Sequence, residues 1–297
     1  MKRVVSVSIG SDKRDHQAEV ELLGEKILIE RRGTNGDIKK AIDLIKELDG
    51  KVDAFGMGGI DLYLVCAGRR YLLRDAKKIL LAAENTPIVD GSGLKNTLER
   101  RIIAQLAENI LDFKGKNVLV TAGVDRFGMA EALEETQCNL ILGDLIFALG
   151  IPIPIRSVSS LANVARVLAP IISQLPFSLI YPTGERQEQN TPKHEKFFKW
   201  ADIIAGDFLF IKRYMPANLK GKILITNTTT ARDLDDLKKR GLRMLITTTP
   251  ELNGRSFGTN VMEAALVALS GKKELNSSEY LDLLEKLQFA PRVVNFS

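Results

Sequence analysis

The spacing of apolar positions changes near residue 115, and this change divides the chain into two parts. In the first part, apolar residues of the segment 38–48 recur at helical spacing behind Asp37, a residue type that caps helices. Polar and apolar positions alternate around residues 20–30 on either side of Gly24, which is typical of a β-hairpin. These patterns predict a small N-terminal α/β domain.

Beyond residue 115, near-continuous apolar runs alternate with amphipathic segments. Strands covered on both faces lose the alternation of half-buried strands, so such runs favour a parallel sheet. The succession predicts a doubly wound, mostly parallel Rossmann-type sheet. We expect a substrate domain over residues 1–113 and a nucleotide-binding domain over 114–297, whose last helix could fold back on the first domain. The strands expected in the second domain are residues 117–122, 139–144, 177–181, 202–206, 222–226 and 243–248.

The composition of the chain indicates which kinds of molecule it can bind. The chain has 297 residues, of which 45% are hydrophobic and 27% charged, and its net charge is +5. Basic residues are not interleaved with aromatic ones, which disfavours nucleic acid as the main partner. No apolar stretch reaches the roughly 20 residues that span a bilayer, and the first residues lack a signal-peptide pattern. We therefore expect a cytoplasmic protein without a membrane partner, with a homodimer as one open assembly.

Cysteine and histidine contribute little chemistry. Cys66 and Cys138 lie in apolar runs without the spacing of metal or redox motifs, and we expect free thiols. His16 and His194 are the only histidines, so a histidine-based metal site is disfavoured and none is predicted.

A glycine turn follows the first strand of the second domain. Dinucleotide-binding turns use one glycine to form the turn, one to admit the pyrophosphate and one to let the helix pack on the strand. Gly123 and Gly128 occupy the first and third positions. Asp125 occupies the second, where a carboxylate opposes a pyrophosphate, and Arg126 could bind a phosphate instead. The turn predicts a dinucleotide site with these residues, weakened by Asp125.

The next predicted strand ends in an acidic residue that bears on the cofactor. Asp144 lies about 20 residues after Gly123, where an acid of this fold accepts hydrogen bonds from the adenine ribose and disfavours a 2′-phosphate. NAD is therefore the expected cofactor, and NADP is less favoured. Two alternatives stay open: Asp144 simply ends a strand, or a Rossmann-like fold holds another ligand.

Polar loops follow several predicted strands at their carboxyl ends, where ligands bind in such folds. The loops near residues 226–230 and 247–260 are rich in hydroxyl and amide groups, and helix capping accounts for only part of them. They predict a small polar or anionic ligand. The residues that we expect to bind it are Thr228, Arg255, Ser256 and Asn260.

Two segments together resemble the shikimate/quinate dehydrogenase family, including quinate 5-dehydrogenases. They are Asp90-Gly-Ser-Gly93 with the helix after it, and the strand segment Lys114-Gly-Lys-Asn-Val-Leu-Val120. In that family such a segment opens the helix between the substrate and nucleotide domains. The close resemblance covers residues 88–133. It implies an NAD-dependent dehydrogenase of a cyclic polyol or hydroxy acid such as quinate or shikimate.

The same resemblance implies two catalytic roles. Asp90 falls on the family's catalytic aspartate, and a lysine would exchange the proton of the alcohol. The family's lysine-bearing segment is absent upstream, so Lys95 is the candidate and Lys78 its alternative. Two other functions stay open: a Rossmann-like nucleotide- or phosphometabolite-binding protein without hydride transfer, and a transferase whose threonine-rich loops hold a phosphate donor.

Overall fold

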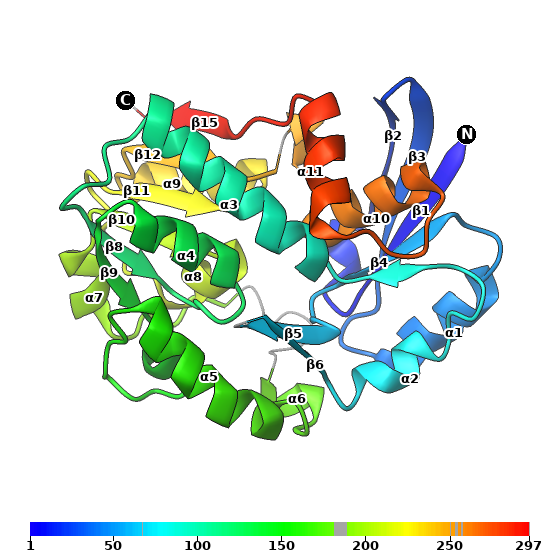
Figure 1. Cartoon of the computed structure of the whole chain (residues 1–297), viewed down its shortest axis with the longest axis horizontal. Helices are drawn as coiled ribbons and strands as arrows, with labels where there is room; N and C mark the ends of the chain where they lie inside the picture. The colour runs from blue at the N-terminus through cyan, green and yellow to red at the C-terminus, as the bar shows by residue number, and fades with distance from the viewer. Residues whose placement is uncertain (67, 181–188, 250, 253–254, 257, 297) are drawn as a thin grey trace. The chain divides into compact units, whose positions relative to one another are not determined.

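The computed structural model describes residues 1–66, 68–180, 189–249, 251–252, 255–256 and 258–296 (Figure 1). The chain forms two units, and each is assembled from three separated segments. Unit 1 comprises Met1–Thr97, Leu168–Gln187 and Leu252–Phe289, and unit 2 comprises Leu98–Val167, Glu188–Glu251 and Ala290–Ser297. This division differs from the predicted single seam at residue 113, because helices α3 (Ser92–Asn109) and α5 (Val158–Ile172) contribute residues to both units.

Unit 1 is built on a five-stranded sheet with the order β2-β3-β1-β4-β7. β1 pairs in parallel with β3 and β4, whereas β2 and β3 form the antiparallel hairpin that the sequence predicted. Inward-facing side chains such as Val5 and Phe55 pack with Ile45 of a helix into one apolar core. The strands are β1 (Lys2–Ser8), β2 (His16–Leu22), β3 (Glu25–Gly33), β4 (Ala54–Gly58) and β7 (Ile88–Val89).

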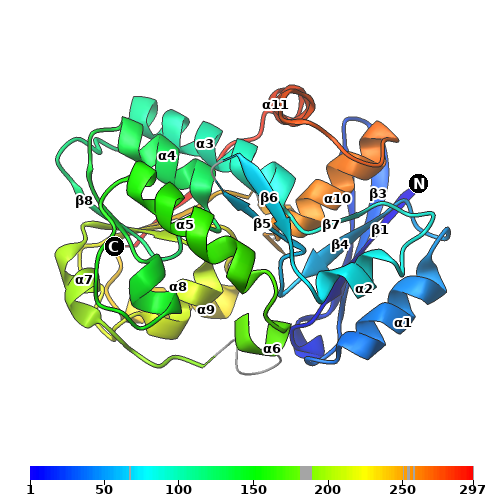
Figure 2. The ribbon, with the colours of Figure 1, turned by 60° about the horizontal axis from the view of Figure 1, so that its bottom comes forward.

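The other elements of unit 1 include the predicted helix α1 (Ile38–Leu48), whose cap Asp37 accepts a hydrogen bond from the backbone N–H of Lys40. Helix α10 packs against β1 and β4, as both ribbon views show (Figures 1 and 2). A Cβ at Gly56 would lie 2.8 Å from the carbonyl oxygen of Asn260, so this contact requires glycine. The remaining elements are η1 (Asp12–Arg14), β5 (Tyr63–Cys66), β6 (Arg69–Leu72), α2 (Ala76–Leu80), α10 (Thr259–Ser270) and α11 (Ser277–Lys286).

Unit 2 contains a six-stranded sheet with the order β15-β12-β11-β10-β8-β9. All its pairings are parallel except that of β15 with β12. Its strands are β8 (Asn117–Val120), β9 (Asn139–Leu142), β10 (Ile203–Gly206), β11 (Ile223–Thr226), β12 (Met244–Thr247) and β15 (Arg292–Asn295). Its other elements are α4 (Phe127–Glu135), the π-helical turn η2 (Asp144–Ala148), α7 (Glu195–Trp200), α8 (Phe208–Tyr214) and α9 (Ala231–Lys239).

The mixed α/β, two-domain fold with parallel sheets is confirmed, but one predicted strand is wrong. Residues 177–180 form the short helix α6 (Phe177–Ile180) in unit 1, where Phe177 lies in the core. A short apolar run is compatible with either a buried strand or a buried helical turn. Here the run forms a helical turn whose Phe177 packs into the unit 1 core. Strands β13 (Glu251–Leu252) and β14 (Arg255–Ser256) pair in a small two-stranded sheet.

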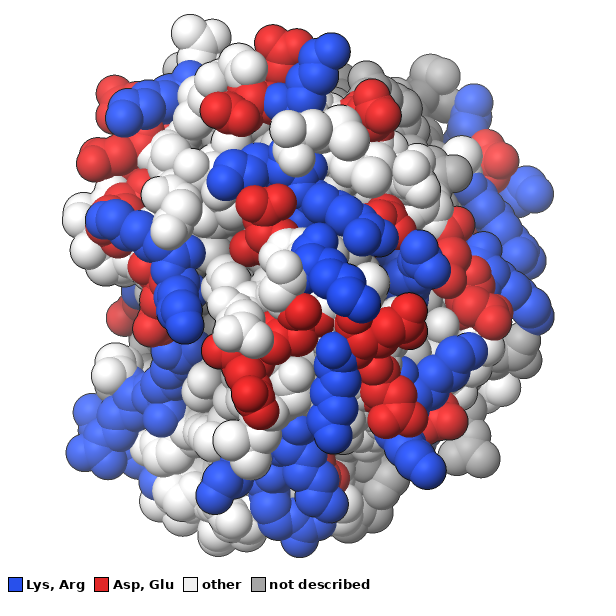
Figure 3. Space-filling view, turned by 90° about the vertical axis from the view of Figure 1, so that its right-hand side faces the viewer, with Lys and Arg blue, Asp and Glu red and all other residues white. Residues whose placement is uncertain are grey.

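The surface and the cysteines agree with an ordinary globular chain. Acidic and basic side chains are intermixed on the face that Figure 3 draws. Neither Cys66 nor Cys138 forms a disulfide with another described residue, and Cys66 is buried. Within the part of the chain that the structure describes, no helix is long and apolar enough to cross a membrane.

Candidate ligand-binding site

The glycine turn after β8 is closed by a side chain of its own unit. The backbone N–H groups of Gly123 and Val124 donate to the two carboxylate oxygens of Asp144, each over 2.9 Å. A Cβ at Gly123 would lie 2.9 Å from Leu161 and 3.1 Å from Asp144. Burial raises the pKa of Asp144 to about 6, against the opposing effect of these hydrogen bonds. The N–H groups that a pyrophosphate needs are therefore already used, and Asp144 points into the turn rather than toward a ribose.

The next residues of the turn build a buried charge cluster. The Arg126 side chain is 2% exposed and contacts Glu99 of α3, which is 1% exposed. Its Nη2 lies 3.2 Å from Asp207 Oδ2 and its Nε lies 3.3 Å from Asp125 Oδ2. Burial alone would lower the pKa of Arg126, but the three carboxylates outweigh it and raise that pKa. Three carboxylates lie against this one guanidinium, so Arg126 is not available to a phosphate.

Asp207 joins this cluster to the next strand end. It caps α8 by accepting from the backbone N–H of Phe210 over 3.1 Å. Its other oxygen accepts from Asn227 Nδ2 over 2.7 Å, and Asn227 Oδ1 accepts from the backbone N–H of Phe208. The amide and the carboxylate are thus held in fixed orientations, while the Asp207 and Asp125 side chains remain 29% and 30% exposed.

Threonines complete this carboxyl edge of the sheet. Thr226 Oγ1 donates to the carbonyl of Gly206 over 2.7 Å, and Thr249 Oγ1 donates to the carbonyl of Asn227 over 2.9 Å. The buried hydroxyls of Thr121 and Thr248 have no hydrogen-bond partner among the described residues. Thr228, which the sequence predicted as a ligand contact, is half-buried beside Asn227. The edge therefore presents carboxylates, an amide and hydroxyls together.

Gly128 lies at the start of the helix that follows the turn, as the third position of the motif requires. It is buried within the first turn of α4 and packs as part of the unit 2 interior. This is the helix-packing role of the third glycine, which the fold uses without a bound dinucleotide.

The predicted catalytic residues lie in unit 1 and are both engaged. Asp90 accepts from the backbone N–H groups of Leu62, Tyr63 and Ser92 over 2.6, 3.1 and 2.9 Å. Lys95 is 7% exposed, and its Nζ lies 3.2 Å from Asp61. Asp90 thus holds two loops together, and Lys95 is a buried ion-pair residue rather than an exposed helix residue.

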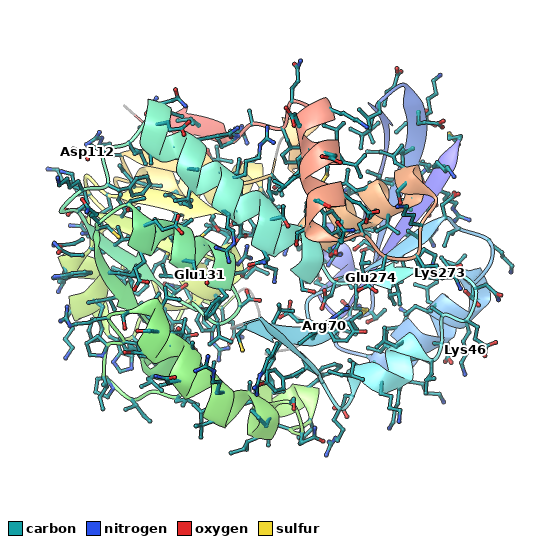
Figure 4. All side chains as sticks on the ribbon, in the orientation of Figure 1. Lys46, Arg70, Asp112, Glu131, Lys273 and Glu274 are labelled. Carbon is teal, nitrogen blue, oxygen red and sulfur yellow. The ribbon has the colours of Figure 1, made fainter. Side chains whose placement is uncertain are left out.

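A buried acid that the sequence did not single out adjoins this pair. Glu263 of α10 accepts from the Tyr280 hydroxyl of α11 over 2.6 Å, and its second oxygen has no hydrogen-bond partner among the described residues. Burial raises the pKa of Glu263 to about 7, with Asp90 adding to the rise and Lys95 opposing it. Nearby, Arg70 donates to Glu274 over 2.6 Å and covers the Tyr63 ring (Figure 4).

Of the residues predicted to form an anion site before α10, the structure describes the side chain of Asn260 but not those of Arg255 and Ser256. Asn260 donates from its side chain to Ser6 Oγ over 2.9 Å and packs against Gly56, Gly58 and Gly91. It therefore anchors α10 to the sheet of unit 1. Arg255 and Ser256 lie on strand β14, and their side chains fall outside the described part of the structure.

Asp207, Asn227 and Glu99 are the site residues that the sequence prediction missed. The loops that carry Asp207 and Asn227 follow predicted strands, so their place at the carboxyl edge was a usable signal. Glu99 lies within a helix and carries no local signal.

Two protein-family models match the sequence. A model described as "Domain of unknown function (DUF8754)" matches residues 93–296, and one described as "Domain of unknown function (DUF8753)" matches residues 3–90. No match was found among curated protein sequences.

Solved structures that this chain matches at low identity include three binding proteins. A galactofuranose binding protein is 13% identical, with 97% of this chain and 99% of that chain covered and a TM-score of 0.39. A glucose-galactose binding protein from Geobacillus stearothermophilus is 11% identical, with 99% and 97% covered and a TM-score of 0.41. An ABC transporter solute-binding protein from Agrobacterium vitis with bound D-fucose is 11% identical, with 99% and 95% covered and a TM-score of 0.36.

These findings correct the expected family and cofactor. The resemblance to shikimate/quinate dehydrogenases is wrong, since the matching structures named above are sugar-binding proteins rather than dehydrogenases. The predictions of an NAD-dependent dehydrogenase, of NAD and NADP as cofactors, and of nucleotide binding as the alternative are wrong with it. The physical reason lies in the turn, where Asp144 takes the N–H groups of Gly123 and Val124.

Proposed function

Because the chain belongs to the family described as a domain of unknown function (DUF8754), whose description names no activity, we propose its function from its own geometry. The protein binds a small, uncharged, polyhydroxylated molecule of the sugar class at the carboxyl edge of the unit 2 sheet. The finer fold assignment that accompanies this proposal is a doubly wound, Rossmann-type sheet in unit 2, supported by the parallel order β12-β11-β10-β8-β9.

The observation that carries the proposal is the pair of part-exposed carboxylates held by buried Arg126. Asp125 and Asp207 keep 30% and 29% of their side chains exposed while the guanidinium fixes both. Ionised carboxylates only accept hydrogen bonds, and a ligand hydroxyl donates one. Asn227 and Thr228 lie at the same edge and supply further groups for hydroxyl recognition.

Charge separates this ligand from the anion that the sequence also allowed. Asp125 and Asp207 present part-exposed carboxylates at this edge, so a phosphate or carboxylate ligand beside them would meet repulsion. A neutral polyol meets none, and a carboxylate-to-hydroxyl bond contributes roughly 1.5–3 kcal/mol because one partner is charged. Sugars are also bound by solved structures of low similarity, but the proposal rests on the residues of this chain.

Asp125→Asn is expected to weaken binding of a neutral sugar at least about tenfold, which corresponds to roughly 1.4 kcal/mol. The substitution keeps the side-chain volume and removes the charge of the accepting group. The measurement is titration calorimetry with D-galactose, D-arabinose, D-fucose and D-glucose, after a thermal-shift screen selects the sugar that raises the melting temperature most.

Asp202→Asn is the matched control. Asp202 accepts from the backbone N–H of Asn117, at the amino end of the same strands, so this variant should bind the sugar as the wild type does. The corresponding aldonate and sugar phosphate should raise the melting temperature less than the neutral sugar. Stabilisation by the anions alone, or equal loss of affinity in both variants, would contradict the proposal.

A further inference from the structure

Unit 2 contains a recess that the proposed sugar site does not use. It has a volume of about 540 Å³, within the range of roughly 300–1,000 Å³ that small-molecule sites occupy. One wall is the segment Ile146–Gly150, which follows β9, and the other is formed by Lys193, His194 and Tyr214. All these residues belong to unit 2.

Aromatic rings form the apolar part of the recess. The Phe147 ring lies 5.4 Å from the Tyr214 ring and 6.1 Å from the His194 ring, which meets it edge-on. Phe147 belongs to the π-helical turn Asp144–Ala148, a rare geometry that is frequent at functional sites. An aromatic ring of a ligand would pack against these side chains in the same offset or edge-on geometry.

The polar part of the recess is basic. The Lys193 side chain is exposed, and both Lys193 and His194 line the recess. His194 adopts the left-handed conformation with φ 54°, which places its ring on Phe147. No acidic residue lines the recess within the described chain, and the neighbouring Glu195 is paired with Lys199 over 3.5 Å. A lysine and a histidine thus line the recess beside apolar side chains, and no described lining residue carries a carboxylate.

The loop that leaves the recess carries exposed apolar side chains. Leu149, which lines the recess, is 47% exposed, and Ile151 and Ile153, which follow it in the chain, are 42% and 58% exposed. Large apolar side chains gathered on a surface mark binding sites more often than single ones do.

We propose that this recess binds a small aromatic carboxylate. The ring of the ligand packs against Phe147 and Tyr214, and its carboxylate pairs with Lys193 beside His194. The two sites of unit 2 differ in charge, since Lys193 lines this recess and part-exposed carboxylates lie at the carboxyl edge.

The test uses the full chain with phenylacetate as the probe and phenylacetamide as its neutral isostere, by ligand-observed NMR and calorimetry. Phenylacetate should bind at least tenfold more tightly than the amide, because Lys193 contributes only to the anion. Lys193→Gln should remove that difference, whereas Lys199→Gln, on the adjoining helix but outside the lining, should preserve it.

A second variant tests the place of binding. Ala148→Trp puts an indole at an exposed lining position and should abolish binding of phenylacetate, with an unchanged circular dichroism melt showing that the protein is folded. Asp125→Asn should leave phenylacetate binding unchanged, which separates this site from the sugar site. Equal affinity for acid and amide, or binding that survives Ala148→Trp, would overturn the proposal.

Discussion

Arg126→Met should lower the free energy of unfolding by about 3–5 kcal/mol, because it removes the guanidinium that pairs with a buried carboxylate. Glu99 is 1% exposed and its guanidinium partner is 2% exposed, so water cannot replace the lost charge. Asp207 would also lose the guanidinium that lies 3.2 Å away. Urea denaturation followed by circular dichroism measures the loss.

The double variant Arg126→Met with Glu99→Gln separates charge from packing. Removing the charge of Glu99 should restore at least about 1 kcal/mol, because the desolvation cost of a buried carboxylate that has lost its guanidinium disappears. Lys199→Met, which breaks the exposed pair with Glu195, should cost less than about 0.5 kcal/mol. A loss of similar size in Arg126→Met and Lys199→Met would show that the Arg126 cluster is hydrated.

Glu263→Gln should remove a dependence of stability on pH that amounts to about 3 kcal/mol. Burial and Asp90 raise the pKa of Glu263 from 4.5 to about 7, so the folded state holds a proton that the unfolded state releases. Stability of the wild type should therefore fall as pH rises from 4.5 to 7 and then level off. The glutamine variant stays neutral and should be the more stable protein above pH 7.

Thermal melts between pH 4.5 and 8.5 measure this difference. Lys95 and Tyr280 also face Glu263, and both favour its ionised form, so their effects are already contained in the pKa of about 7. Glu285→Gln, an exposed site on α11, is the matched control and should follow the wild-type profile. Parallel profiles for wild type and Glu263→Gln would contradict a buried, protonated Glu263.

The sequence patterns correctly predicted those helices and turns whose structure depends on residues close by in the chain. Asp37 caps α1 as its side chain and position required, and the hairpin around Gly24 formed where polar and apolar residues alternate. Gly123 and Gly128 likewise lie in a strand-turn-helix segment. The strand predicted over residues 177–181 was wrong because an apolar run of this length suits either a strand or a helical turn. Residues 177–180 form a helix, in which Phe177 packs into the core.

The site could be predicted only in part, because its chemistry depends on distant residues. The glycines of the turn do not show that Asp144, at the end of another strand, takes their N–H groups. Arg126 looked available to a phosphate because Glu99 and Asp207 are remote in sequence. Asp90 similarly had the sequence context of a catalytic residue, yet it accepts three backbone hydrogen bonds.

The discontinuous units also constrain how the chain matures on the ribosome. Helix α10, residues Thr259–Ser270, packs against β1 and β4, which are complete by residue 58. At roughly 5–20 residues per second, translation needs about 10–40 s to deliver that helix after β4 has been made. During this interval the nascent sheet lacks its cover, so unit 1 cannot mature before most of the chain has been translated. Chains with contiguous domains can fold one domain after another, whereas here each unit waits for segments made after parts of the other.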